Sequence, residues 1–132
     1  MTVHRFILGN RAIVVGSPDD ELTGTAAPFA VLTPAYSDVE REVVLKRAGT
    51  LLTMGCIEFC CVGPAAELLH DALDDIIEND GALSVVTTWH TDEKDACEYF
   101  LFAAGGAVKS LVALISLHPE LVELLSLTAQ ED

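Results

Sequence analysis

The sequence has few basic residues: 7 lysines and arginines stand against 21 aspartates and glutamates, for a formal net charge of −14. The imbalance lies in residues 67–132, which carry 2 basic and 14 acidic side chains, against 5 and 7 in residues 1–66. Such a surface repels nucleic-acid phosphates and anionic membranes, so neither is an expected partner. It would attract a basic protein. The acids also serve solubility, because 51% of the residues are apolar.

Aromatic residues make up only 6% of the chain, so Val, Leu, Ile and Ala must fill the core. Cysteine is also scarce, with three of the four cysteines in the segment CIEFCCVG, residues 56–63, and no Cys-x-x-Cys pair. Neighbouring residues of a strand point to opposite faces, so Cys60 and Cys61 are poorly placed to bind one metal ion together. We therefore expect buried, reduced thiols, no metal site, no cofactor and a cytoplasmic location.

The common nucleotide and hydrolase signatures are absent. No Gly-x-Gly-x-x-Gly or Gly-x-Ser-x-Gly occurs, and GGAVKS has Val108 where a phosphate-binding loop needs glycine. Residues 1–11 lack the apolar run of a signal peptide, and Lys109 interrupts the longest apolar stretch. We expect neither a signal peptide nor a membrane span.

Strand-like and helix-like segments alternate along the chain. Residues 3–8 and 11–16 flank a Gly-Asn pair, which predicts a β-hairpin. Further strands are predicted at 29–33, 56–62 and 82–89. Helices are predicted to begin at the capping box of Ser37 and Glu40, at Pro64, at the cap Thr91 and at Pro119.

Residues 108–116 have no periodicity that separates a strand from a helix, and we favour a strand. The alternation then predicts an α/β fold: a single three-layer domain over residues 1–132, with a mostly parallel sheet flanked by helices. The N-terminal hairpin makes this sheet mixed. Residues 128–132, TAQED, are expected to form a disordered tail.

Ligands of such a sheet bind beyond the carboxyl ends of its strands. Gly63, Trp89 and His90 fall at these ends and are the expected ligand pocket, with Trp89 itself mostly buried. His118 would lie at the same edge if residues 108–116 form the last strand. The candidate catalytic residues are His90, Asp92, Glu93 and His118. Asp92 and Glu93 would equally suit the first turn of a helix, where the helix dipole favours acids.

A second candidate site is the polar face of the helix that follows Pro64. Its apolar residues repeat at helical spacing on one side, and acids occupy the other. The expected partner-binding residues on this face are Glu67, His70, Asp71, Asp74, Asp75 and Glu78. A solvated face without a partner is the alternative interpretation.

Three motifs together resemble a family of small, acidic bacterial proteins of unknown function. They are the Cys-rich strand ending in Gly63, the His70-Asp71 pair on the next helix, and Thr-Thr-Trp-His at 87–90. The resemblance covers residues 56–105. It implies an α/β fold and a bacterial cytoplasm, and it brings no activity and no catalytic residue.

Three hypotheses about function follow. The first is a non-enzymatic acidic module that binds a basic protein, as an immunity protein or an inhibitor does. The second is a small-ligand-binding protein or hydrolase-like enzyme that uses a strand-end pocket around His90. The third is a structural homo-oligomer, such as a homodimer, because the apolar tail SLVALISL, residues 110–117, exceeds what one small core needs.

Overall fold

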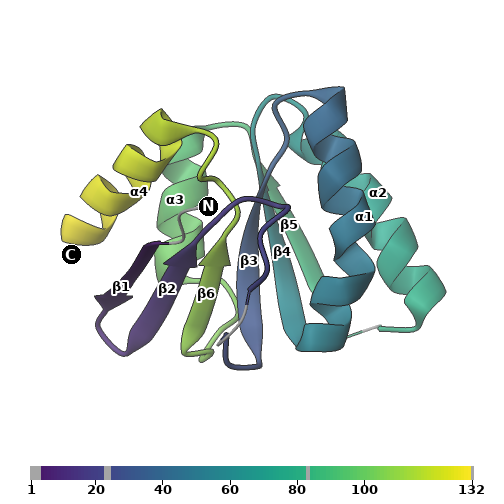
Figure 1. The fold of residues 1–132 in the computed structure, drawn as a ribbon, viewed down its shortest axis with the longest axis horizontal. Coiled ribbons are helices and arrows are strands. Elements are labelled where there is room, and N and C mark those ends of the chain that lie inside the picture. Colours follow the sequence, from purple (N-terminus) through teal and green to yellow (C-terminus); the bar gives the residue numbers. More distant parts are fainter. Residues whose placement is uncertain (1–3, 23–24, 83, 132) are drawn as a thin grey trace.

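The computed structural model of the chain describes residues 4–22, 25–82 and 84–131. Strands and helices alternate after an opening hairpin, as predicted (Figure 1). In chain order the elements are β1 (His4–Leu8), β2 (Arg11–Val15), β3 (Phe29–Pro34), α1 (Asp38–Met54), β4 (Cys56–Val62), α2 (Ala66–Asp80), β5 (Val86–His90), α3 (Glu93–Phe102), β6 (Ser110–Ala113) and α4 (Pro119–Gln130).

The strands form one mixed sheet in the order β1-β2-β6-β3-β4-β5. β1 and β2 are antiparallel, and every other neighbouring pair is parallel. The predicted α/β fold with a hairpin at one edge is therefore confirmed. The ambiguous segment is a strand, β6, and it lies in the middle of the sheet, where Leu111–Ile115 are buried.

Helices cover both faces of the sheet (Figure 1). α1 and α2 pack on one face, over a core that includes Phe29, Phe59 and Leu114. α3 and α4 pack on the other, over a core that includes Leu32, Phe100 and Ile115. The central strands are mostly apolar because both of their faces are buried.

Two predicted boundaries near β5 are wrong. Asp92, and not Thr91, caps α3, because its carboxylate accepts the backbone N–H of Asp95 at 2.9 Å. β5 begins at Val86 and includes His90 as its last residue, whereas the predicted strand covered 82–89. Thr and Asp are both common N-cap residues, so the sequence alone does not show which of two adjacent residues of these types caps the helix.

The predicted disordered tail at 128–132 is helical as far as Gln130. Thr128 is buried and its hydroxyl donates to the carbonyl of Leu124 at 2.6 Å. Lys94 of α3 joins Glu131 at 2.6 Å and so holds the end of α4 against α3. Asp132 lies outside the described residues.

All four cysteines are free and buried, as expected. Cys60 belongs to the core under α3 and α4, and Cys61 to the core under α1 and α2, which follows from the alternation of side chains along β4. Burial raises the pKa of the Cys61 thiol from 9.0 to about 12, so the thiol stays protonated at neutral pH.

A thiol reagent should therefore find no reactive cysteine in the folded protein. We expect Ellman's reagent at pH 8 to modify fewer than one thiol per chain in buffer and all four in denaturant. Rapid modification of any cysteine under native conditions would contradict the buried, protonated state and would identify the thiol that is exposed.

Candidate functional site

The carboxyl ends of the parallel strands meet at one edge of the sheet. Strands β3 and β6 are neighbours there, but the chain leaves β3 toward α1 on one face and leaves β6 toward α4 on the other (Figure 1). Such a reversal opens a crevice between the two loops, and open α/β sheets bind ligands at this position.

Four side chains, here named the switch-point cluster, meet at this crevice: Tyr36, Glu40, Glu93 and His118. Tyr36 follows β3, and Glu40 lies in the first turn of α1. Glu93 opens α3, and His118 precedes Pro119 at the start of α4. The cluster thus joins three loops that are far apart in the sequence.

The carboxylate of Glu40 holds two parts of this cluster. Its Oε1 accepts the backbone N–H of Tyr36 at 2.9 Å, and its Oε2 lies 2.5 Å from Nε2 of His118. Of the predicted capping box the Ser37 half is present, since the Ser37 hydroxyl accepts the N–H of Glu40 at 3.1 Å, whereas the Glu40 carboxylate accepts the N–H of Tyr36 and not that of Ser37. Glu40 therefore fixes the chain just before α1 and contacts a histidine with the same carboxylate.

The two aromatic rings of the cluster are in contact. The centroids of Tyr36 and His118 are 4.3 Å apart, with their planes tilted by 34°. The Tyr36 hydroxyl donates to Glu93. Burial, followed by the hydrogen bond and negative charge of Glu93, raises the pKa of Tyr36 well above its ordinary value. The phenol consequently stays neutral and a hydrogen-bond donor.

Two cavities lie on either side of the exposed Leu117. One, of about 440 Å³, is lined by Tyr36, Glu93, Leu117, His118, Pro119, Glu120 and Leu121. The other, of about 310 Å³, is lined by Pro18, Asp19, Ser37, Val39, Glu40, Val43 and Leu117. The first is in the size range of sites for small molecules.

The predicted catalytic residues do not all lie in one site. Glu93 and His118 belong to the switch-point cluster. Asp92 caps α3. His90 lies at the end of β5, with β3 and β4 between it and β6, and its ring centroid is 5.4 Å from that of Tyr99. The Nδ1 atom of His90 is buried and has no hydrogen-bond partner within the described part of the chain.

The predicted burial of Trp89 is wrong, because 40% of the residue is exposed. β5 is an edge strand, so among the described residues no strand pairs with its outer side. Gly63 has a structural role at the same end: its N–H donates to the carbonyl of His90, and a Cβ there would lie 2.8 Å from the carbonyl oxygen of Ala35. A role of either residue in ligand binding stays a prediction.

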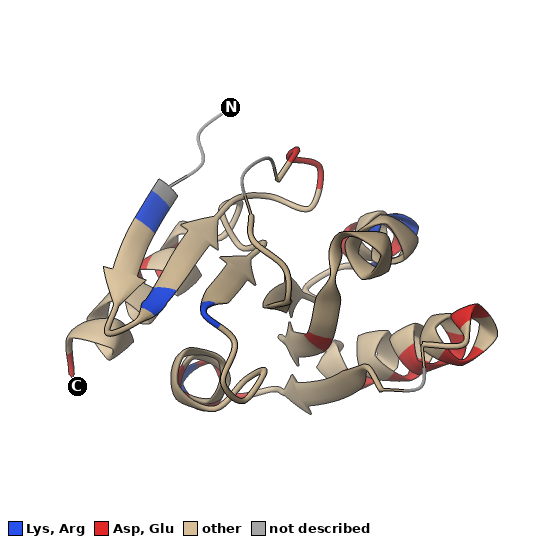
Figure 2. Cartoon of the chain, turned by 90° about the horizontal axis from the view of Figure 1, so that it is seen from below, with Lys and Arg blue, Asp and Glu red and all other residues tan. Residues whose placement is uncertain are grey.

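A second surface runs along α2 to the edge strand β5. We name it the α2–β5 acidic surface and define it by the exposed residues Glu67, Asp71, Asp74, Asp75, Glu78 and Trp89. Figure 2 shows the acidic residues of α2 in red along the helix. The Thr87 hydroxyl donates to Asp74 and so joins the helix to the strand.

Within the described part of the chain, the one side chain that forms ion pairs with the acids of this surface is a histidine. His70 lies 3.0 Å from Asp71 and 3.7 Å from Asp74. Within residues 4–22, 25–82 and 84–131, no lysine or arginine forms an ion pair with its five carboxylates. The two arginines of α1 are engaged elsewhere: Arg41 pairs with Asp38, and Arg47 donates to the carbonyl of Asp20.

Glu58 is a buried acid that the sequence interpretation missed. It is 5% exposed on β4, and its carboxylate accepts the hydroxyl of Tyr99 at 2.6 Å, the hydroxyl of Thr88 at 3.2 Å and the N–H of Gly105 at 2.8 Å. Every partner is a neutral donor. The signal in the sequence was a single charged residue inside the apolar strand CIEFCCV.

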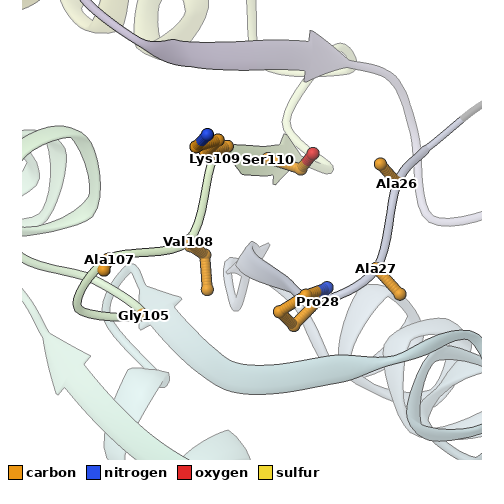
Figure 3. Close-up of a pocket in the computed structure, with 8 residues that line it drawn as sticks. All are labelled: Ala26, Ala27, Pro28, Gly105, Ala107, Val108, Lys109 and Ser110. Atoms are coloured by element: carbon orange, nitrogen blue, oxygen red, sulfur yellow. The ribbon is translucent and has the colours of Figure 1, made fainter.

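A further cavity, of about 510 Å³, lies at the opposite, amino-terminal edge of the sheet (Figure 3). The segment 26–28 and the loop 105–110 face one another across it. Lys109 is the one ionisable side chain among its described lining residues, so the cavity lacks the paired groups that acid–base chemistry needs.

Metal binding and membrane insertion find no support in the described residues. No three His, Cys, Asp or Glu side chains among them are grouped as metal ligands. None of the helices in that part of the chain is both long and apolar enough to cross a bilayer.

These features define an open α/β protein with an acidic switch-point crevice and an acidic edge. The chain belongs to a family described as "Domain of unknown function (DUF7684)", whose model matches residues 13–129. The expected membership of an uncharacterised family is thereby confirmed, over a longer segment than the 56–105 of the resemblance. No curated protein matches the chain.

Proposed function

We propose that this protein is a non-enzymatic binding module that engages a basic protein through the α2–β5 acidic surface. The observation that carries the proposal is the set of five exposed carboxylates on α2, none of which pairs with a lysine or arginine among the described residues. A basic partner would be steered to this surface and would neutralise it on binding.

The placement of these acids lowers the stability of the free helix. Asp71 and Asp75 are four residues apart, as are Asp74 and Glu78, and each like-charge pair costs about 0.2–0.5 kcal/mol. The last turn of α2 contains no basic residue, so its acids also face the negative end of the helix dipole. Binding of a cationic surface would reverse both costs.

Exposed apolar groups give such a partner something to pack against. Trp89 is 40% exposed, and Leu68 on α2 is 60% exposed. Tryptophan is enriched among the residues that dominate binding energy at interfaces. Acids with an exposed indole beside them favour a partner that is basic and partly apolar over a purely charged one.

Neutralising α2 should weaken binding and stabilise the free protein. The variant is Asp71→Asn, Asp75→Asn and Glu78→Gln, which spares Asp74 and its bond to Thr87. We expect its affinity for an alternating Lys-Leu peptide, measured by fluorescence anisotropy, to fall at least about tenfold. We expect its free energy of unfolding in urea to rise by about 0.5–1 kcal/mol.

The matched control removes three exposed acids from other helices and so reaches the same net charge: Glu42→Gln, Glu98→Gln and Glu123→Gln. Its affinity should change less than about threefold and its stability by less than about 0.5 kcal/mol. If both variants lose affinity equally, the peptide responds to net charge alone, and the acids of α2 serve solubility only.

The buried thiols support a reducing compartment, and we include a cytoplasmic location in the proposal.

One argument for a homo-oligomer was the apolar segment 110–117, but residues 111–115 are buried within the chain's own sheet. A monomer in size-exclusion chromatography with light scattering is the result expected here, and a stable dimer would instead support self-association.

A further inference from the structure

We propose that the switch-point cluster is a binding site for a small organic cation, an alkylammonium or a guanidinium. This site lies at the β3–β6 crevice, whereas the α2–β5 acidic surface lies at the far edge strand. The two proposals rest on different residues, so either one can fail alone.

The charge of the crevice selects the sign of the ligand. Four carboxylates line the two cavities, and no lysine or arginine does so. They are Asp19, Glu40, Glu93 and Glu120. An anion would meet this negative charge at close range, and a cation would be attracted by it.

The helix N-termini at this edge would otherwise favour an anion. Helices α1, α3 and α4 all begin here, but each already carries acids in its first turn. Those carboxylates occupy the positive ends of the helix dipoles. Three of them, Glu40, Glu93 and Glu120, also line the cavities, and Asp19 adds a carboxylate from outside the helices. Because a carboxylate carries a full charge against about half a charge at a helix N-terminus, the crevice stays negative toward a ligand.

The aromatic pair selects the chemical class of the cation. Tyr36 and His118 are fixed against one another by Glu93 and Glu40, and both line the larger cavity. A neutral phenol ring attracts ammonium and guanidinium groups through its face. A bare divalent ion is disfavoured, because no three ligand side chains group together among the described residues.

The site accommodates a ligand of a few carbon atoms. The larger cavity has about 440 Å³ and is open to solvent beside Leu117, which is 67% exposed. Leu117 and Leu121 line it together with Pro119, so an alkyl chain would contact apolar side chains while its charged end faces Glu93 or Glu120. A diamine meets both requirements.

The test uses 1,4-diaminobutane and methylguanidine as probes and succinate as the anionic control. We expect both cations to shift the amide resonances of Tyr36, Glu93 and His118 in ¹⁵N spectra of the full chain, with saturation, and succinate to leave them unchanged. Glu120→Gln, which removes a lining charge, should weaken binding about tenfold.

The matched control is Glu123→Gln on the same helix, at an exposed residue outside the cavity lining. It should change the affinity less than about twofold. Three results would each overturn the proposal: no saturable shift at the cluster, equal binding of succinate, or equal loss of affinity in the two variants. Shifts confined to α2 would show that the cations recognise only net charge.

Discussion

Raising the pH from 7 to 10 is expected to remove most of the stability of this protein. Burial raises the pKa of Cys56, Cys61 and Cys97 from 9.0 to about 12. Burial, followed by the nearby Glu58, also raises the pKa of Cys60. All four thiols are therefore harder to ionise in the folded state than in the unfolded state.

The sign of the effect follows from proton linkage. Below pH 9 the thiols are protonated in both states, and their contribution to stability is fully present. As the pH rises from 9 toward 12, the unfolded chain releases protons that the folded chain retains, so stability is lost. At pH 10 each thiol costs on the order of 1 kcal/mol, and the four together cost on the order of 5 kcal/mol.

This loss is as large as the whole stability of many domains, which is about 5–15 kcal/mol. The measurement is urea denaturation followed by circular dichroism at pH 7, 8.5, 9.5 and 10. Stability should be level up to about pH 8.5 and then fall steeply. A change of less than about 1 kcal/mol between pH 7 and pH 10 would contradict the expected thiol ionisation.

Cys97→Ala provides the internal control. The variant should be less stable at pH 7, because it leaves a small cavity under α3. Above pH 9 its stability should fall less steeply than that of the natural chain, by on the order of 1 kcal/mol per pH unit. If stability falls equally steeply with pH in both proteins, groups other than the Cys97 thiol cause the alkaline transition. Tyr36 and Tyr99 would be the first to examine, because burial also raises their pKa values.

The fold was accessible from sequence because its signals are local. The Gly-Asn turn, the capping box at Ser37 and the Gly55 that ends α1 each specify a boundary within a few residues. Gly55 has a φ of 111°, a conformation that glycine adopts readily. The alternation of these elements was then enough to predict a parallel sheet with both faces covered.

The strand order was not accessible, and the errors at the candidate sites follow from it. Trp89 was predicted to be buried because alternation placed it on one face of a strand, but β5 is the edge strand and leaves it exposed. Placing β6 beside β3 brings His118 to Glu40, 78 residues earlier in the chain. The capping box already accounted for Glu40, so nothing in the local pattern indicated its second partner.

Glu58 illustrates the same limit within a strand. A carboxylate in the apolar segment CIEFCCV suggests an exposed position, but β4 has a neighbour on each side and helices on both faces. The residue is buried because α3 supplies Tyr99, and the loop after α3 supplies the N–H of Gly105. These donors replace water around the carboxylate, which keeps its burial tolerable.

Glu58→Ala is expected to destabilise the protein by about 3–4 kcal/mol, since it removes the acceptor of four hydrogen bonds, one of them a weak bond from the Cys60 thiol, and leaves their donors partly buried. Tyr99→Phe, which removes only one donor, should cost about 1–2 kcal/mol. In a double-mutant cycle the two losses should not add, because the variants share one bond. Urea denaturation of the two single variants and the double variant measures this.

Amide hydrogen exchange locates the effect within the structure. The N–H of Gly105 donates to Glu58 in the natural chain, so it should exchange slowly there and also in Tyr99→Phe. In Glu58→Ala the same amide should exchange rapidly. Amides of β6, in the middle of the sheet, should still exchange only by global unfolding, at the rate that the lowered stability of the variant sets. If Glu58→Ala matches the natural chain in both stability and Gly105 exchange, the carboxylate does not hold the end of α3 to the sheet. Retention of this buried acid would then have to be explained by a function at Glu58 itself.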